Sequence, residues 1–227
     1  MRMHRRAAVA LAASVFLAPH AAHSQAAVGL RAFGGYNTYA MDDAEDIRRG
    51  LLVPASQFPQ LKDGYSLGLG AELSWKPSLS FTLSYERIAV GRMSDITIHD
   101  RSGNVTGSGK MQLPCNALLL EAEYRRRLKP RIVIGAAGGG GYYQLGEEVE
   151  SPATDQNFQG NTVGGQAFAL GEWELTPAAS VGLDLGYRWA KVGVDKVNFQ
   201  PPPRDIDVDY SGLDTRIVLR YLPRHGR

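Results

Sequence analysis

Charged side chains recur at every second position in several segments of this sequence, and these residues are the best suited to do chemistry. Alternate positions of a β-strand share one face, so the charges would share one face too. Paired carboxylates can act as general acid and base, and carboxylates that face arginines can line an ion path. The set comprises Arg31, Glu72, Glu86, Glu121, Glu123, Glu172, Glu174, Asp184, Arg188, Asp214, Arg216 and Arg220.

The histidine inventory argues against an enzyme. Three of the five histidines fall within residues 1–24, a segment with the features of a cleaved leader, which leaves His99 and His225. His225 lies in the C-terminal tail. His99 and Ser102 could be read as part of a lipid-hydrolase site. We place them in a polar connection rather than on a strand at a barrel rim, and therefore predict no catalytic residue.

Two further motifs have a structural interpretation. The glycine-rich run at residues 135–141 lacks the Gly-Lys-Ser/Thr ending of a phosphate-binding loop and lies inside an alternating pattern. We expect its glycines to make room for bulky neighbours or to bend a sheet. The basic run at residues 125–131 has the composition of a nucleic-acid site, but it falls where a short turn is expected. A solvated turn near anionic lipid headgroups accounts for it, so we predict no nucleic-acid partner.

No cofactor or metal site is predicted. Asp205, Asp207 and Asp209 alternate and could bind a cation, but the glycine and the distal glutamate of an EF-hand loop are missing. The single cysteine, Cys115, excludes an intramolecular disulfide and has no histidine partner nearby in the sequence. We expect it to be an inert residue of a strand.

The N-terminus is predicted to direct export. A basic start with Arg2, Arg5 and Arg6 precedes an apolar run, and Ala22 and Ser24 supply the small residues of a cleavage site. Residues 1–24 are therefore assigned to a signal peptide and residues 25–227 to one mature domain. The leader holds three arginines and no acid, so the mature chain has 22 basic and 23 acidic residues. The basic pI of the whole sequence comes in part from the leader.

A hairpin at residues 64–87 shows the period that organises the whole chain. Leu67, Leu69 and Leu73 share one parity, while glycine, serine and Glu72 occupy the other. The same alternation resumes after a turn that contains Pro77. Strict alternation on both sides of a tight turn is typical of a β-hairpin. A continuous apolar face opposite a small, polar and charged face favours a strand pair between lipid and a polar interior.

Eight segments of this kind alternate between short turns and long connections. The short turns lie near residues 77, 129 and 177, and the long connections cover residues 40–63, 91–109, 146–161 and 191–211. This arrangement predicts an all-β fold, an eight-stranded antiparallel up-and-down transmembrane barrel. The predicted strands cover residues 28–39, 65–75, 79–86, 116–124, 131–145, 166–175, 179–189 and 213–221.

Aromatic residues gather near both ends of the apolar parity. Ten steps separate the aromatic or apolar ends of several strands, which spans about 23 Å at a tilt near 45° and matches the apolar band of an outer-membrane barrel. Two interfacial girdles are therefore expected. The loop-side girdle comprises Tyr36, Tyr65, Tyr85, Tyr142, Tyr187 and Trp189, and the turn-side girdle Trp75, Phe81, Tyr124, Trp173 and Tyr221.

The mature chain resembles the small eight-stranded outer-membrane barrels of Gram-negative bacteria, the OmpA/OmpX-like proteins and the opacity-type surface antigens. The resemblance rests on architecture rather than on a diagnostic motif. It implies a place in the bacterial outer membrane, contact with outer-membrane lipid and lipopolysaccharide, and insertion by the barrel-assembly machinery. One departure from the pattern is the C-terminus, where Tyr221 is followed by Leu222 and a tail instead of ending the chain.

The interior of an eight-stranded barrel is only wide enough for side chains to fill it. Charges in such a space must be paired or hydrated, so we expect a salt-bridge plug rather than an ion path. The long connections at residues 40–63, 146–161 and 191–211 are acidic in sum. These features predict a non-enzymatic surface scaffold whose acidic loops mediate envelope or surface interactions.

Three alternatives remain open from the sequence. A lipid-modifying enzyme of the outer membrane would need a site that the remaining histidines do not readily provide. A narrow channel former would need an interior that is not plugged. A soluble lipocalin-like carrier is also an eight-stranded barrel, but it would have to bury its apolar parity inside and expose the polar one.

Overall fold

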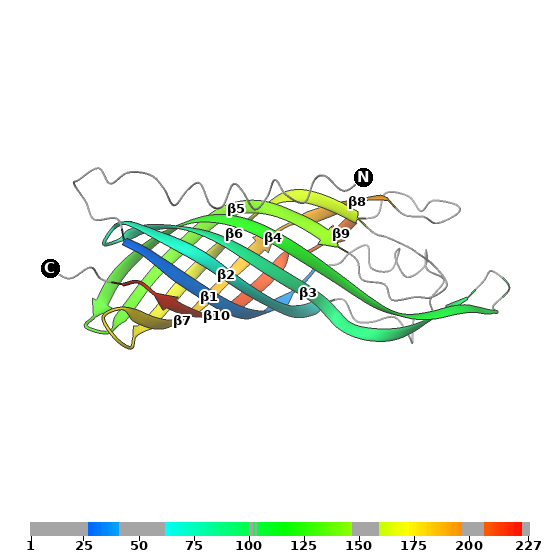
Figure 1. The fold of residues 1–227 in the computed structure, drawn as a ribbon, viewed down its shortest axis with the longest axis horizontal. Helices are drawn as coiled ribbons and strands as arrows, with labels where there is room; N and C mark the ends of the chain where they lie inside the picture. Colours follow the sequence, from blue (N-terminus) through cyan, green and yellow to red (C-terminus); the bar gives the residue numbers. More distant parts are fainter. Residues whose placement is uncertain are drawn as a thin grey trace.

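A computed structural model describes residues 27–40, 62–99, 102, 104–146, 159–196 and 207–223, and these form a closed antiparallel β-barrel (Figure 1). Both edges of the sheet are joined, because β1 pairs with β2 and β10 while β5 pairs with β4 and β6. The predicted eight-stranded barrel is therefore confirmed. The strands are β1 (Ala27–Thr38), β2 (Asp63–Lys76), β3 (Leu79–His99), β4 (Val105–Lys129), β5 (Ile132–Gly146), β6 (Gln159–Glu174), β7 (Ala179–Trp189), β8 (Lys191–Lys196), β9 (Asp207–Asp209) and β10 (Gly212–Tyr221).

Short turns close one end of the barrel, which we call the turn end; the opposite end is the loop end. The turn between β6 and β7 shows how the local sequence makes them. The hydroxyl of Thr176 accepts hydrogen bonds from the backbone N–H groups of Ala178 and Ala179, at 3.2 and 3.0 Å. These side-chain bonds add to the backbone bond from the N–H of Ala179 to the carbonyl of Thr176 at 3.4 Å, and Pro177 supplies the fixed φ that a turn favours.

The predicted connection at residues 91–109 is wrong. β3 continues to His99 and β4 begins at Val105, and after a bulge the two strands pair from Ser94 and Met111 onward. Figure 1 shows this ribbon reaching past the rest of the barrel. The apolar–polar alternation here is short, with Ile96 and Ile98 as its apolar members, and the ladder is a continuation of the β3–β4 pairing in the barrel wall. His99 is consequently the last residue of a strand and not part of a polar loop.

The predicted connection at residues 191–211 is also wrong in part. β8 follows β7 after one residue, Ala190, and pairs with β6 and with β9. Ala190 separates β7 from β8, and Tyr210 lies between β9 and β10. The backbone N–H of Tyr210 donates to the carbonyl of Ala190 at 2.8 Å, so these two breaks in the strands are joined. β8 and β9 therefore continue the barrel wall beyond the length that alternation predicted.

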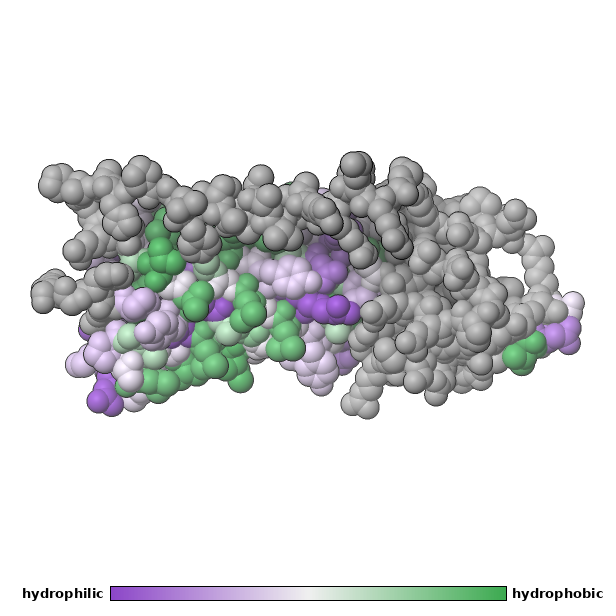
Figure 2. Space-filling view, viewed as in Figure 1, coloured by the Kyte–Doolittle hydropathy of each residue, from purple (hydrophilic) through white to green (hydrophobic). Residues whose placement is uncertain are grey.

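The two faces of the wall differ as the period of two requires. Leu67 and Leu69 are 72% and 69% exposed, whereas Arg31 and Arg216 on the inward face are 1% and 0% exposed. Figure 2 shows hydrophobic side chains gathered over the wall formed by β1 and β2. This arrangement is the reverse of a lipocalin-like carrier, which needs an apolar interior. The part of the chain that the structure describes contains no helix that is long and apolar enough to span a membrane.

Glycines of the run at residues 135–141 face both sides of the wall. A Cβ on the inward-facing Gly139 or Gly141 would collide with a carbonyl oxygen of β4, so only glycine fits there. The run is thus part of β5, and its inward glycines allow the close approach of the neighbouring strand.

Candidate functional site in the barrel interior

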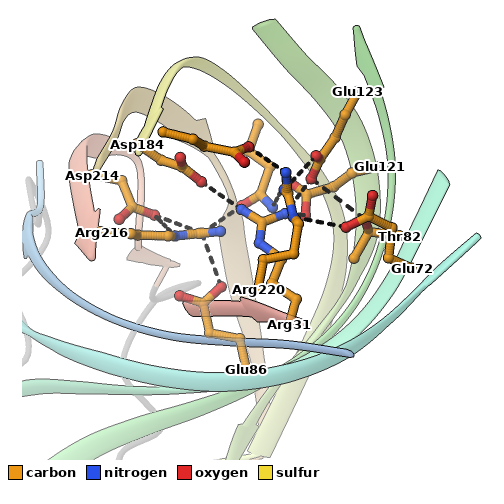
Figure 3. Close-up of polar contacts among 12 residues, drawn as sticks. Arg31, Glu72, Thr82, Glu86, Glu121, Glu123, Asp184, Asp214, Arg216 and Arg220 are labelled. Atoms are coloured by element: carbon orange, nitrogen blue, oxygen red, sulfur yellow. Dashed lines mark hydrogen bonds and ion pairs between the residues drawn. The ribbon is translucent and has the colours of Figure 1, made fainter. Parts of the chain in front are cut away.

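The interior holds a network of arginines and carboxylates that come from widely separated strands (Figure 3). Arg31 on β1 forms ion pairs with Glu121 and Glu123 on β4 and with Asp184 on β7. Its side chain is fully buried, as are those of both glutamates. Since β4 and β7 lie on different sides of β1 in the strand order, Arg31 joins distant parts of the wall across the interior.

Arg220 on β10 forms a second centre near the turn end. Its guanidinium lies 2.7 Å from Glu72 and 2.7 Å from Glu123, and it also pairs with Glu172. Arg125 on β4 contacts Glu72 as well. Together with the contacts of Arg31, these pairs form the turn-side cluster, in which three guanidinium groups face five carboxylates: Arg31, Arg125, Arg220, Glu72, Glu121, Glu123, Glu172 and Asp184.

Two arginines and two carboxylates form the loop-side cluster. Arg188 on β7 lies 2.7 Å from Glu86 and 2.6 Å from Asp214. Arg216 on β10 contacts the same two acids at 3.1 and 2.7 Å. All four side chains are at least 99% buried, and their formal charges balance. Charge-assisted hydrogen bonds of this length are among the stronger ones in proteins.

Gln166 on β6 connects the two clusters. Its carbonyl oxygen accepts a hydrogen bond from Arg216 at 3.0 Å, and its amide nitrogen donates to Glu121 at 3.0 Å. The guanidinium of Arg216 also lies between two aromatic rings, 4.7 Å from the centroid of Phe33 and 4.3 Å from that of Phe168. Stacking on two rings favours a guanidinium over an ammonium group at this position.

Two inward-facing glycines make room for these rings. A Cβ on Gly68 would collide with the ring of Phe33, and a Cβ on Gly186 would collide with that of Phe168. The small residues on the polar parity of β2 and β7 are thus necessary for the position of Arg216. Alternation predicted their parity, but only the structure shows what they accommodate.

The structure brings together eleven of the twelve charged residues predicted for the interior. Glu174 is the exception, because it pairs with Arg127 at the turn end, where the side chains are 21% and 49% exposed. The sequence-based prediction missed Arg125 and Gln166. Arg125 was assigned to a solvated turn, although it continues the inward parity of Glu121 and Glu123 on β4.

Mainly apolar and aromatic side chains fill the loop end of the interior, on the loop side of Glu86 and Arg188. Tyr143 and Tyr210 are 0% exposed, and in the described residues neither hydroxyl has a hydrogen-bond partner. Tyr39 packs edge-to-face against Tyr210, with ring centroids 6.0 Å apart. We call this group the apolar cap; it also includes Ile88, Val90, Leu113, Cys115, Leu145, Val192 and Val208, each buried.

The predicted girdle aromatics lie on the outer face. All are exposed except Phe81, which is half-buried and packs edge-to-face against Trp75 at 6.2 Å. At the loop end, Tyr36 packs against Tyr65 with ring centroids 5.6 Å apart. The other exposed members are Tyr85, Tyr124, Tyr142, Trp173, Tyr187, Trp189 and Tyr221.

The aspartates considered for a cation have other partners where the structure describes them. Asp207 pairs with Lys191 at 3.0 Å, and Asp209 accepts a hydrogen bond from the backbone N–H of Ser211 at 2.8 Å. Asp205 and the proposed signal peptide lie outside the described residues. Within the described ranges, no three His, Cys, Asp or Glu side chains are placed to hold a metal ion.

No protein-family model matches the sequence, and no curated protein is similar to it. Its structure is similar to that of the outer membrane protein OprG from Pseudomonas aeruginosa, with a TM-score of 0.55, 13% identity, and coverage of 88% of this chain and 98% of OprG. Neisserial surface protein A is 11% identical, with a TM-score of 0.49 over 87% of this chain and 99% of that protein. The chain has the fold of the small eight-stranded outer-membrane barrels.

Proposed function

We propose that this protein is a non-enzymatic, integral barrel of the bacterial outer membrane that acts as a surface scaffold. Three features support this function: the barrel fold, the exposed apolar wall and the buried charge network. In this proposal the interior is closed and the long acidic connections at the loop end carry recognition. Lipid, lipopolysaccharide and the barrel-assembly machinery are the partners that such a protein requires.

The charge network is the observation that carries the proposal. Arg31 contacts β4 and β7 at the same time, and Arg188 on β7 reaches Glu86 on β3. An ion that passed through the barrel would have to separate several of these pairs in a space that side chains already fill. Oppositely charged groups attract strongly at low effective dielectric, so the pairs should hold the lumen shut.

A measurement of conductance tests this closure. The purified protein, inserted in a planar bilayer, should show little or no steady single-channel current. A heat-dependent shift in gel mobility should first establish that the barrel is folded, and resistance to release with the periplasm should establish that it is integral. Large, stable channels from the unmodified protein would replace the scaffold with a narrow channel former.

Recognition by the loops can be tested separately. Residues 147–158 carry three glutamates and one aspartate and lie between Gly146 and Gln159, which pair directly across β5 and β6. A short Gly/Asn turn should bridge these two residues, because shorter loops cost less closure entropy. We expect the heat-modifiable barrel to persist and any surface binding by this acidic segment to be lost. A deletion variant that no longer folds would assign residues 147–158 to the scaffold.

A further inference from the structure

The turn-side cluster holds more acids than cations (Figure 3). Its five carboxylates face three guanidinium groups, which leaves a formal excess of two negative charges. The loop-side cluster holds two groups of each sign and is balanced. Among the side chains that the structure describes, no lysine or arginine outside these two clusters is buried. The excess of the turn-side cluster therefore has no counter-ion among them.

Burial makes this excess costly. The side chains of Glu72, Glu121 and Glu123 are fully buried, and those of Asp184 and Glu172 are 3% and 7% exposed. A carboxylate without a counter-ion loses its hydration in such a place. A buried carboxyl group commonly avoids this cost by binding a proton and becoming neutral.

The shortage of positive charge falls on two of the five acids. Three carboxylates share the guanidinium group of Arg31, namely those of Glu121, Glu123 and Asp184. Glu123 also pairs with Arg220. Within the described residues, Glu121 and Asp184 have no second cation, and the contact from Arg31 to Glu121 is long, at 3.4 Å. These two acids therefore lack a cation of their own.

The remaining acids, Glu72 and Glu172, do not have this shortage. Arg220 forms ion pairs with both of them. Arg125 also contacts Glu72 and lies 3.9 Å from Glu172. The hydroxyl of Ser180 donates a further hydrogen bond to Glu172 at 3.2 Å. Both acids are thus stabilised in the ionised form.

The neighbours of Glu121 add no positive charge. Gln166 on β6 donates a hydrogen bond to it at 3.0 Å, but the amide is neutral. Thr82 lies opposite Glu121 on β3 and donates its hydroxyl to Glu123, at 3.4 Å. On the other side, β5 places Gly139 opposite Glu121. Because a neutral donor stabilises a carboxylate less than a cation does, Glu121 is suited to hold a proton.

The neighbours of Asp184 do not supply a free cation either. Leu170 on β6 and Arg216 on β10 lie opposite Asp184 in register. The guanidinium of Arg216 lies 3.1 Å from Glu86 and 2.7 Å from Asp214. The balanced loop-side cluster needs both of its cations, so Arg216 has no charge to spare for Asp184.

We propose that Glu121 and Asp184 form a proton-binding site, so that the closed barrel holds two protons at neutral pH that the unfolded chain does not. In an unfolded chain these carboxyl groups are ionised at neutral pH. Because the folded state binds more protons, the stability of the barrel falls as the pH rises and is greatest in mildly acidic surroundings. The closed interior thus responds to pH, which a fully balanced network would not do near neutral pH.

The first test is equilibrium unfolding of the full-length protein by urea in phosphatidylcholine vesicles, between about pH 6 and about pH 9. Each proton released on unfolding raises the unfolding constant about tenfold per pH unit, so two protons give up to about a hundredfold. Glu121→Gln and Asp184→Asn should each reduce this dependence by up to about tenfold per pH unit. Both variants should keep their stability at neutral pH, because an amide has the shape of the protonated acid.

Two matched variants serve as controls. Glu174→Gln removes an acid at the turn end that is 21% exposed, and the pH dependence should not change. Glu123→Gln removes an acid with two cations, and stability should fall throughout the pH range. Infrared spectroscopy gives a second readout, the C=O stretch of protonated carboxyl groups. This band should be present in the folded protein at neutral pH, weaker in Glu121→Gln and Asp184→Asn, and unchanged in Glu174→Gln.

Three results would overturn the proposal: an unfolding constant of the unmodified protein that does not change with pH, equal pH dependence in Glu121→Gln, Asp184→Asn and Glu174→Gln, or no infrared band of protonated carboxyl groups. A stability that rises with KCl and is independent of pH would also overturn it, because an inorganic cation would then supply the missing charge. None of these outcomes bears on the scaffold function, which the conductance at neutral pH and the loop deletion test independently.

Discussion

The two charged clusters and the apolar cap fill different parts of the barrel interior with different kinds of side chain. The turn-side and loop-side clusters use charged groups that each need partners at defined positions, such as Arg31 with Asp184. The apolar cap uses residues such as Leu113 and Leu145, which need only to fill space. The clusters should therefore be sensitive to any change of partner, whereas the apolar cap should be sensitive mainly to volume.

Removal of both arginines of the loop-side cluster should produce the largest effect. Arg188→Ala with Arg216→Ala leaves Glu86 and Asp214 buried without a cation, which should cost at least about 3–5 kcal/mol of folding free energy in lipid vesicles. Brief conducting states should appear in a planar bilayer as water enters. Adding Glu86→Gln and Asp214→Asn should recover part of the stability. If it recovers none, the loss comes from packing rather than from stranded charge.

Substitutions that preserve side-chain volume should show most clearly how the charged clusters differ from the apolar cap. Glu123→Gln keeps the volume but removes the charge shared by Arg31 and Arg220, and we expect a loss of about 1.5–3 kcal/mol. Leu113→Met in the apolar cap should cost less than about 1.5 kcal/mol. Urea-dependent unfolding in lipid vesicles measures both. The reverse order would show that the apolar cap, and not the charge network, depends on exact fit.

The smallest effect should come from the hydroxyl of Tyr143. Because this group is buried without a hydrogen-bond partner in the described residues, Tyr143→Phe should stabilise the barrel by about 1 kcal/mol. Tyr85→Phe, which removes the bond to Asn116, is the control and should not stabilise it. A destabilising Tyr143→Phe variant would indicate that the hydroxyl has a partner, such as a bound water molecule, and that the apolar cap is more polar than its residues suggest.

Alternation predicted the parts of this fold that depend on neighbours in sequence. Glu121 and Glu123 alternate within one strand, so their shared inward face could be read directly. The partners of Arg31 could not, because they depend on the register of β1, β4 and β7 around a closed sheet. Gln166 was missed for a similar reason: its role as a link exists only once Arg216 and Glu121 are both in place.

The extended strands were missed because their sequence has no strong period. Residues 91–109 are rich in glycine, serine and threonine and were assigned to a connection, whereas residues 94–99 of β3 pair with residues 105–111 of β4. The apolar cap depends in part on β8 and β9, which fall in a predicted connection. Because Val192 and Val208 were not expected to lie in strands, the alternation pattern did not predict an apolar loop end.

The distribution of charges along the chain has a consequence for the order of assembly. Arg216 and Arg220 lie on β10, the last strand, while Glu72 and Glu86, two of their partners, lie on β2 and β3. In a nascent sheet that lacks β10, Arg125 would still face Glu72 and Arg188 would still face Glu86, but the network would be short of two cations. The full set of ion pairs forms only when the first and last strands meet, so the seam between β1 and β10 should close in a single cooperative step. Truncated chains without β10 should therefore not be released from the assembly machinery as stable barrels.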